Sequence, residues 1–135
     1  MSVITTNKAE AAPVVTTPKQ RALAAKVAAT KVGSWYSWGA SGPSTFDCSG
    51  LVAYAYRSAK RPLQARTTYQ LARLGARISR KGLKPGDLVF THDRSLGHVG
   101  IYVGRNRYVH APGRGRRVQL APVPGGGAFV RAIRP

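Results

Sequence analysis

The stretch that decides the fold is Phe46-Asp47-Cys48-Ser49-Gly50-Leu51-Val52-Ala53-Tyr54-Ala55-Tyr56, which contains the only cysteine of this 135-residue chain. Its apolar residues recur at spacings of one, three and four, which predicts a helix with one buried face that starts at Cys48 and runs to about Ala59. Pro62 stops this helix. Because peptide dipoles at a helix start favour a thiolate, Cys48 is a candidate nucleophile.

A lone cysteine is more commonly a small buried apolar residue. Here the neighbours of Cys48 are the polar Asp47 and Ser49, and the preceding loop over residues 39–45 is rich in Gly and Ser. Such a loop leaves the helix start accessible, whereas a structural cysteine would sit in mid-helix among apolar residues. The context therefore favours a reactive thiol.

Two histidines downstream supply a candidate base and a candidate orienting group. From Gly86 onward the hydrophobic period changes to two, which predicts a sheet. On the strand that follows His98, the imidazole shares a face with Gly100, and this small residue leaves room above the sheet. A tight turn at residues 104–107 reverses the chain and brings His110 back near His98, in a register that the sequence leaves open.

The expected helices come first in the chain and the expected strands follow. This order predicts one α+β domain, in which the Cys48 helix packs on a mostly antiparallel sheet. Pro18 starts an alanine-rich helix that ends near Gly33, and a further helix is expected over residues 68–78. Five strands are expected over residues 88–90, 99–103, 108–110, 117–120 and 129–133. Residues 1–17 are expected to be a flexible leader or linker, so that the folded domain spans residues 18–135.

Five ordered motifs resemble those of the NlpC family of papain-like cell-wall cysteine peptidases, over roughly residues 20–135. The motifs are Tyr36-Ser37-Trp38-Gly39, Phe46-Asp47-Cys48-Ser49-Gly50-Leu51-Val52, Lys84-Pro85-Gly86-Asp87-Leu88-Val89-Phe90, Gly97-His98-Val99-Gly100-Ile101-Tyr102 and His110-Ala111-Pro112. Any one of them alone would be a weak signal, but five in order are a strong one.

The resemblance implies a papain-like fold and a peptidoglycan hydrolase that cuts the stem peptide between D-glutamate and the third-position diamino acid. It implies that Cys48 is the nucleophile, His98 the base and His110 the group behind it, with an acyl-enzyme intermediate. The Tyr36 hydroxyl and the Cys48 backbone N–H would hold the oxyanion. Asp47 and Ser49 are expected to cap the helix or to contact the substrate.

The charge balance points to an anionic partner. With 22 basic and 4 acidic residues the net charge is +18, which no fold requires. Wall polymers and nucleic acid are both candidates, but no nucleic-acid recognition motif is present. Three arginines recur along the helix expected over residues 68–78 and at its end, either as a solvated face or as a wall-polymer contact: Arg73, Arg77 and Arg80.

Other features of the sequence limit the possible cofactors and the possible location of the protein. Cys48, His98 and His110 lack the spacing of metal ligands, and no cofactor is expected. No stretch is long and apolar enough for a membrane span, and the first eight residues lack the pattern of a secretory signal. Action at the cell wall would then need export by another route, a larger precursor or phage delivery. We expect a monomer.

Three alternatives to the peptidase stay open. An amidase or acyltransferase on a papain-like fold would use the same thioester chemistry, although in permuted relatives the histidine precedes the cysteine, and here Cys48 precedes His98. A nucleic-acid-binding module would explain the charge without catalysis. A non-catalytic wall-binding domain would fit a buried Cys48.

Overall fold

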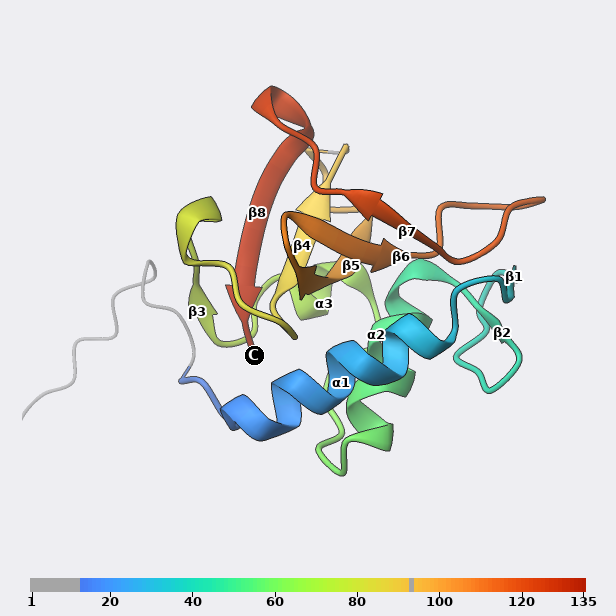
Figure 1. Cartoon of the computed structure of the whole chain (residues 1–135), viewed down its shortest axis with the longest axis horizontal. Helices are drawn as coiled ribbons and strands as arrows, with labels where there is room; N and C mark the ends of the chain where they lie inside the picture. Colours follow the sequence, from blue (N-terminus) through green and yellow to red (C-terminus); the bar gives the residue numbers. More distant parts are fainter. Residues whose placement is uncertain (1–12, 93) are drawn as a thin grey trace, which may run out of the picture.

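The computed structural model describes residues 13–92 and 94–135 (Figure 1). Its helices are α1 (Pro18–Thr30), α2 (Cys48–Ser58), α3 (Thr68–Leu71) and the short 3₁₀ turns η1 (Arg80–Gly82) and η2 (Gly126–Ala128). Its strands are β1 (Trp35–Tyr36), β2 (Thr45–Phe46), β3 (Ala76–Arg77), β4 (Leu88–Thr91), β5 (Val99–Gly104), β6 (Arg107–His110), β7 (Gln119–Pro122) and β8 (Phe129–Arg134).

Six of the strands form one sheet in the order β3-β8-β4-β5-β6-β7, and every neighbouring pair in it is antiparallel. The α+β class and all five predicted strands are confirmed, with shifts of one to two residues at their ends. The sixth strand, β3, was not predicted. A separate two-stranded parallel pair, β1 with β2, lies next to the start of α2.

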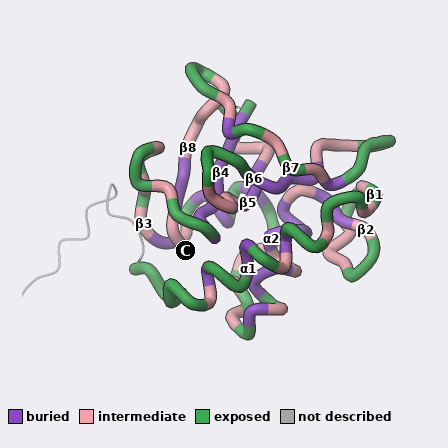
Figure 2. Tube along the Cα trace, in the orientation of Figure 1, coloured by how far each residue is buried: buried purple, intermediate pink, exposed green. Residues whose placement is uncertain are grey.

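Helices α1 and α2 lie against the sheet and against each other (Figure 1). The apolar stripe of α2, with Leu51, Val52 and Ala55, is fully buried in a core that also contains Phe90 and Ile101 of the sheet. Figure 2 shows this buried interior between the helices and the central strands, with exposed loops around it. The packing fixes the first turn of α2 relative to β5 and β6.

The helix predicted over residues 68–78 is wrong beyond its first turn. Helix α3 ends at Leu71, and residues 76 and 77 form β3, which pairs with β8. Gly75 has a φ of +60°, and a Cβ there would lie 1.7 Å from the carbonyl oxygen of Arg134. Only glycine allows this close approach, so the chain leaves the helix and joins the sheet edge.

The folded unit begins before Pro18. The first twelve residues of the expected leader lie outside the described residues. Thr16 is buried, and its backbone N–H and hydroxyl both donate to the carbonyl of Pro135, while Thr17 caps α1. The Arg21 guanidinium donates to the Thr16 carbonyl at 2.7 Å. Residues 16 and 135 are therefore held together by hydrogen bonds.

Candidate active site

Asp47 sets the position of Cys48 by capping α2. Its Oδ1 accepts the Gly50 backbone N–H at 2.6 Å, and its Oδ2 accepts the Gly39 N–H at 2.9 Å. A Cβ on Gly50 would lie 1.9 Å from the carbonyl oxygen of Ala40, so glycine lets the preceding loop pass directly over the helix start. The capping role expected for Asp47 is confirmed, and α2 begins at Cys48.

The two histidines meet as the alternation of the strand predicts. In the β5–β6 register, Gly100 lies opposite His110, which places His98 and His110 diagonally on one face. Nε2 of His98 lies 2.8 Å from Nδ1 of His110. The predicted pairing of these two residues is confirmed, although their catalytic roles stay predictions.

Tyr108 holds the second histidine in place, and the sequence analysis missed it. Its ring stacks on His110, with centroids 4.6 Å apart and planes at 11°. A Cβ on Gly100 would lie 2.4 Å from this ring, so the space that Gly100 leaves above the sheet is filled by Tyr108. The Tyr108 hydroxyl lies 3.1 Å from the Thr91 hydroxyl, which fixes the far end of the ring.

The predicted site residues line a continuous cleft on both sides of Cys48. One part, about 630 Å³, is lined by Tyr36, Cys48, His98 and His110. A second part, about 490 Å³, contains no histidine and is lined by residues that include Asp47, Ser49, Arg66, Thr68 and Tyr69. The two parts share four residues, Tyr36, Trp38, Cys48 and Gly97, so they meet at the thiol.

The environment of the thiol does not by itself favour a thiolate. Burial is the largest effect and raises the pKa of Cys48. The backbone N–H of Val99 lowers it, the Asp47 carboxylate raises it by a smaller amount, and the N–H groups of Ser49 and Cys48 lower it. Burial thus opposes the lowering of the thiol pKa that is expected from the helix start, and the acidity expected for Cys48 with His98 as its partner stays a prediction. A positively charged partner would favour ionisation of the thiol.

His110 and Tyr36 are both uncharged at neutral pH. Burial and the neighbouring His98 lower the pKa of His110 to about 4, so its imidazole is uncharged at neutral pH. Burial and the nearby Cys48 raise the pKa of Tyr36, so its phenol keeps its proton. His110 can therefore accept a hydrogen bond at Nδ1, and Tyr36 can donate one.

Arg66 is a site residue that the sequence analysis did not single out. Its guanidinium lies 3.3 and 3.2 Å from the two carboxylate oxygens of Asp47 and donates to the Ser49 hydroxyl at 2.7 Å. Ser49 also lies 3.3 Å from Asp47 Oδ1. Arg66 sits in the loop before α3, 18 positions from Cys48, and no local pattern connects it to the helix start.

Three arginines gather at the far end of α3, but they are not the three expected. Arg131 of β8 donates to the carbonyl of Ala72 at 3.4 Å, next to Arg73, and Arg77 lies opposite Ile133 on the neighbouring strand. Burial and the charges of Arg77 and Arg73 lower the pKa of Arg131. We call Arg73, Arg77 and Arg131 the arginine cluster.

Arg80 belongs elsewhere. It lies in η1, where its guanidinium donates to the carbonyls of Pro124 and Val123 and to the side chain of Asn106. It also lies 5.4 Å from the ring centroid of Phe129. These contacts tie down the η1 turn, so the expectation that Arg80 shares a helix face with Arg73 and Arg77 is wrong.

Within residues 13–92 and 94–135, no group of three or more His, Cys, Asp and Glu side chains is arranged to hold a metal ion. The described helices are all too short or too polar to cross a bilayer. Both described carboxylates form ion pairs: Asp47 with Arg66, and the buried Asp87 with Arg134 at 2.8 Å. The chemistry available at the cleft is that of a thiol, two imidazoles and a phenol.

Comparison with known proteins finds related sequences and structures. The sequence model of the NlpC/P60 family matches residues 33–132. Murein DD-endopeptidase MepH of Escherichia coli is 42% identical over 107 residues, which cover 72% of this chain and 40% of that protein. A probable endopeptidase of Corynebacterium glutamicum is 39% identical over 110 residues, covering 82% of this chain and 50% of that protein.

Solved structures agree with these matches. NlpC2 from Trichomonas vaginalis superposes with a TM-score of 0.79 at 31% identity, over 89% of this chain and 48% of that one. The peptidoglycan hydrolase RipB of Mycobacterium tuberculosis superposes with a TM-score of 0.75 at 26% identity, over 85% of this chain and 64% of that one. The chain thus spans about half the length of the curated relatives named above, and the papain-like NlpC fold is confirmed.

Proposed function

Because this chain belongs to the NlpC/P60 family, we propose that it is a peptidoglycan endopeptidase that cuts stem-peptide amide bonds with Cys48 as nucleophile. The observation that carries the proposal is the meeting of Cys48, His98, His110 and Tyr36 in one cleft. The coupling of His98 to a neutral His110 supports their assignment as base and orienting group.

The mechanism follows from the states of these groups. Because Nε2 of His98 is hydrogen-bonded to His110, we assign Nδ1 of His98 as the atom that takes the Cys48 proton. The thiolate attacks the carbonyl carbon, and the C–N bond breaks as His98 returns the proton to the leaving nitrogen. Water then attacks the thioester carbonyl and gives a proton to His98, and the C–S bond breaks to release the carboxylic acid as His98 passes that proton to the Cys48 sulfur.

Two donors at the start of α2 are suited to the oxyanion. The backbone N–H of Cys48 lies in the first turn, where helical N–H groups lack carbonyl partners within the helix. The Tyr36 hydroxyl lines the same cleft and stays protonated because its pKa is raised. Both would gain strength as the carbonyl oxygen becomes negative.

The second part of the cleft supports cleavage after D-glutamate. Since the amine leaves on the side of the histidines, the acyl half of the substrate occupies the part lined by Arg66, Ser49 and Thr68. A γ-linked D-glutamate keeps a free α-carboxylate close to the scissile carbonyl. A guanidinium with two hydroxyls beside it is well suited to bind that carboxylate.

A second bond is a candidate because of MepH, whose name assigns it to DD-endopeptidases. Such an enzyme cuts the D,D crosslink between two stem peptides and leaves each stem whole. The cleft on both sides of Cys48 is open, so it can take either peptide, and the thioester chemistry is the same.

Digestion of purified muropeptides followed by mass spectrometry separates these functions. We expect fragments that begin at the diamino acid, from monomers and dimers alike. Conversion of dimers to intact monomers would assign the D,D crosslink instead. Intact monomers and dimers after long incubation with the folded protein would overturn the endopeptidase proposal itself.

The arginine cluster supports a second contact with the wall. Among the described residues both carboxylates are paired with other arginines, so Arg73, Arg77 and Arg131 have no carboxylate partner there. Three guanidinium groups that repel one another lower their energy by binding a polyanion. We assign this cluster to anionic wall polymers, in line with action at the cell wall.

A further inference from the structure

Thr91 carries a buried hydroxyl beside the cleft that the proposed mechanism does not use. It is the last residue of β4 and is fully buried. Its Oγ1 lies 3.1 Å from the hydroxyl of Tyr108 and 2.8 Å from Nδ1 of His92. One buried hydroxyl therefore connects two rings, one on β6 and one in the loop after β4.

His92 is held in place through both its backbone and its side chain. Its φ is +68°, in the left-handed region that residues other than glycine adopt rarely. Its backbone N–H donates to the carbonyl of Ala128 at 2.7 Å. His92 lines the cleft with His98, and the centroids of these two rings are 6.1 Å apart with planes at 62°. The two imidazoles thus pack edge to face.

The contacts close into a network of five side chains. Nε2 of His98 lies 2.8 Å from Nδ1 of His110, whose ring stacks on Tyr108. The Tyr108 hydroxyl meets Thr91, which also meets His92. His92 in turn packs against His98. Each ring of the His98–His110 pair therefore packs against a second ring, and Thr91 is bonded to both of those second rings.

The network also assigns a tautomer to His92. Burial raises the pKa of Tyr108, so its phenol keeps a hydrogen to donate. The arrangement in which each hydroxyl donates once runs from Tyr108 to Thr91 and from Thr91 to Nδ1 of His92. Neutral His92 then carries its proton on Nε2, and its ring cannot rotate without leaving a buried hydroxyl unpaired.

We propose that Thr91 and His92 are positioning residues of the proposed reaction. The Thr91 hydroxyl fixes the rings of His92 and Tyr108, and those two rings hold the His98–His110 pair at the angle that proton transfer to and from the thiol requires. The inference rests on the proposed function, because it concerns the same reaction. A misplacement of about 1 Å at a reacting group can cost about a hundredfold in rate.

The first test replaces the Thr91 hydroxyl by a methyl group in Thr91→Val and restores it in Thr91→Ser. In the positioning role Thr91 adds no binding energy for the substrate, so its loss should act on kcat. On muropeptides we expect Thr91→Val to lower kcat about tenfold or more with KM within about twofold, and Thr91→Ser to recover most of this loss. Wild-type kcat in Thr91→Val would overturn the inference.

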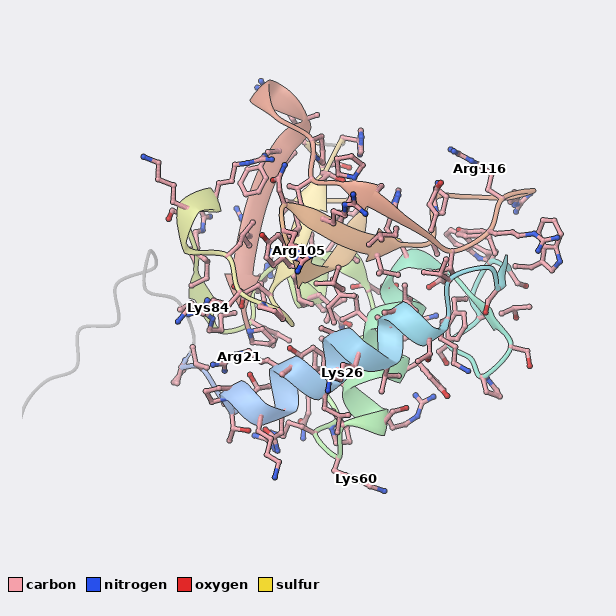
Figure 3. The ribbon with its side chains drawn as sticks, in the orientation of Figure 1. Arg21, Lys26, Lys60, Lys84, Arg105 and Arg116 are labelled. Atoms are coloured by element: carbon pink, nitrogen blue, oxygen red, sulfur yellow. The ribbon has the colours of Figure 1, made fainter. Side chains whose placement is uncertain are left out.

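Thr16→Val is the matched control, because Thr16 is also buried and its hydroxyl is also bonded, but it does not line the cleft. In Figure 3, Arg21, which binds Thr16, lies at the start of α1, well away from Arg116, which lines the cleft. We expect Thr16→Val to lose stability and to keep kcat. An equal loss of kcat in Thr16→Val and Thr91→Val would reduce Thr91 to a structural role.

His92→Asn tests the other end of the contact without a threat to folding. His92 is exposed, and asparagine tolerates a positive φ. We expect kcat to fall as in Thr91→Val, and the double variant to lose no more than the larger single loss, because both changes break the same contact. Wild-type kcat in His92→Asn, or losses that multiply in the double variant, would contradict a shared role.

A spectroscopic measurement keeps the inference separate from the proposed function. The chain has three histidines, so NMR of histidine labelled with ¹⁵N in the ring follows all of them and needs no substrate. Thr91→Val should shift the ring signals of His92, His98 and His110, whereas Thr16→Val should shift none of them. This result supports the inference even if wild type cleaves no muropeptide, which would overturn only the endopeptidase proposal. Unmoved signals of His98 and His110 in Thr91→Val would overturn the inference.

Discussion

Nδ1 of His110 lies 2.8 Å from Nε2 of His98, and burial together with the His98 charge lowers the pKa of His110 to about 4. A neutral His110 can accept at Nδ1 only as the tautomer that carries its proton on Nε2. His98 then donates from Nε2 in both of its charge states. In the proposed mechanism His110 would therefore orient the base His98 as a neutral acceptor, in place of a carboxylate.

The lowered pKa of His110 predicts how stability depends on pH. The folded pKa, about 4, lies below the ordinary value of 6.5, so the unfolded chain binds this proton first as the pH falls. The free energy of unfolding should thus decrease from pH 6.5 towards pH 4. In His110→Asn, whose side-chain oxygen can still accept from His98, melting temperatures over this range should fall less steeply than in wild type. The same slope in both proteins would contradict a neutral, buried His110.

The raised pKa of Cys48 predicts that its thiolate depends on His98. Without an imidazolium partner the effect of burial dominates, so the pKa of the Cys48 thiol in His98→Ala should lie above the usual thiol value. Wild type should titrate lower, because the thiolate and the imidazolium form as a pair. The rate of iodoacetamide alkylation against pH measures both. If the two proteins show the same inflection, His98 does not stabilise the thiolate.

Arg66 should matter for turnover more than for stability. It joins Asp47 and Ser49 at the start of α2, but 41% of its side chain is exposed, so the ion pair adds about 1 kcal/mol or less to folding. Arg66→Gln should lower kcat/KM on muropeptides about tenfold or more, and Arg66→Lys should recover only part of it because lysine lacks the forked geometry. Arg107→Gln, an exposed arginine on β6, is the control. Unchanged kinetics in Arg66→Gln would show that Arg66 only stabilises the loop before α3 and does not contact the substrate.

The arginine cluster should govern attachment to the wall and not chemistry at the bond. Replacing Arg73, Arg77 and Arg131 by Gln should weaken the sedimentation of the protein with sacculi that keep their anionic polymers. The sedimentation should also depend less on salt, because salt screens charge attraction beyond about 8 Å at physiological ionic strength. Turnover of small soluble muropeptides should stay within about twofold, since surface changes away from the site cost little. The matched control replaces Lys26, Arg105 and Arg107, and should bind almost as wild type. Equal weakening by both triples would mean that total charge, not this cluster, sets attachment; a greater loss for DNA than for sacculi would assign the cluster to nucleic acid.

The sequence predicts well how Cys48, His98 and His110 are placed, because the signals for that placement are local. The polar Asp47 before an apolar helical stripe fixes where α2 starts, and the two-residue period of β5 fixes which face carries His98. The turn at residues 104–107 leaves only the register undecided, and Gly100 opposite His110 settles it in the structure.

What the sequence does not predict depends on contacts between distant segments. Residues 72–78 have helical propensity, yet Gly75 passes so close to Arg134 that the chain joins the sheet. Arg66 reaches Asp47 across 19 positions, and Thr16 reaches Pro135 across 119. Hydrophobic periodicity carries no information about such pairs, so the sixth strand of the sheet, the Arg66 contact and the contact of Thr16 with Pro135 are seen only in the structure.

The account rests on Cys48 as the nucleophile, and one comparison tests it most directly. The melting temperatures of purified wild type and Cys48→Ala are measured first. Both proteins are then incubated with the same muropeptides, and the products are quantified by mass spectrometry. The account predicts that Cys48→Ala melts near wild type and loses activity by several orders of magnitude, because no other side chain in the cleft can form the thioester. Substantial cleavage by Cys48→Ala would contradict it.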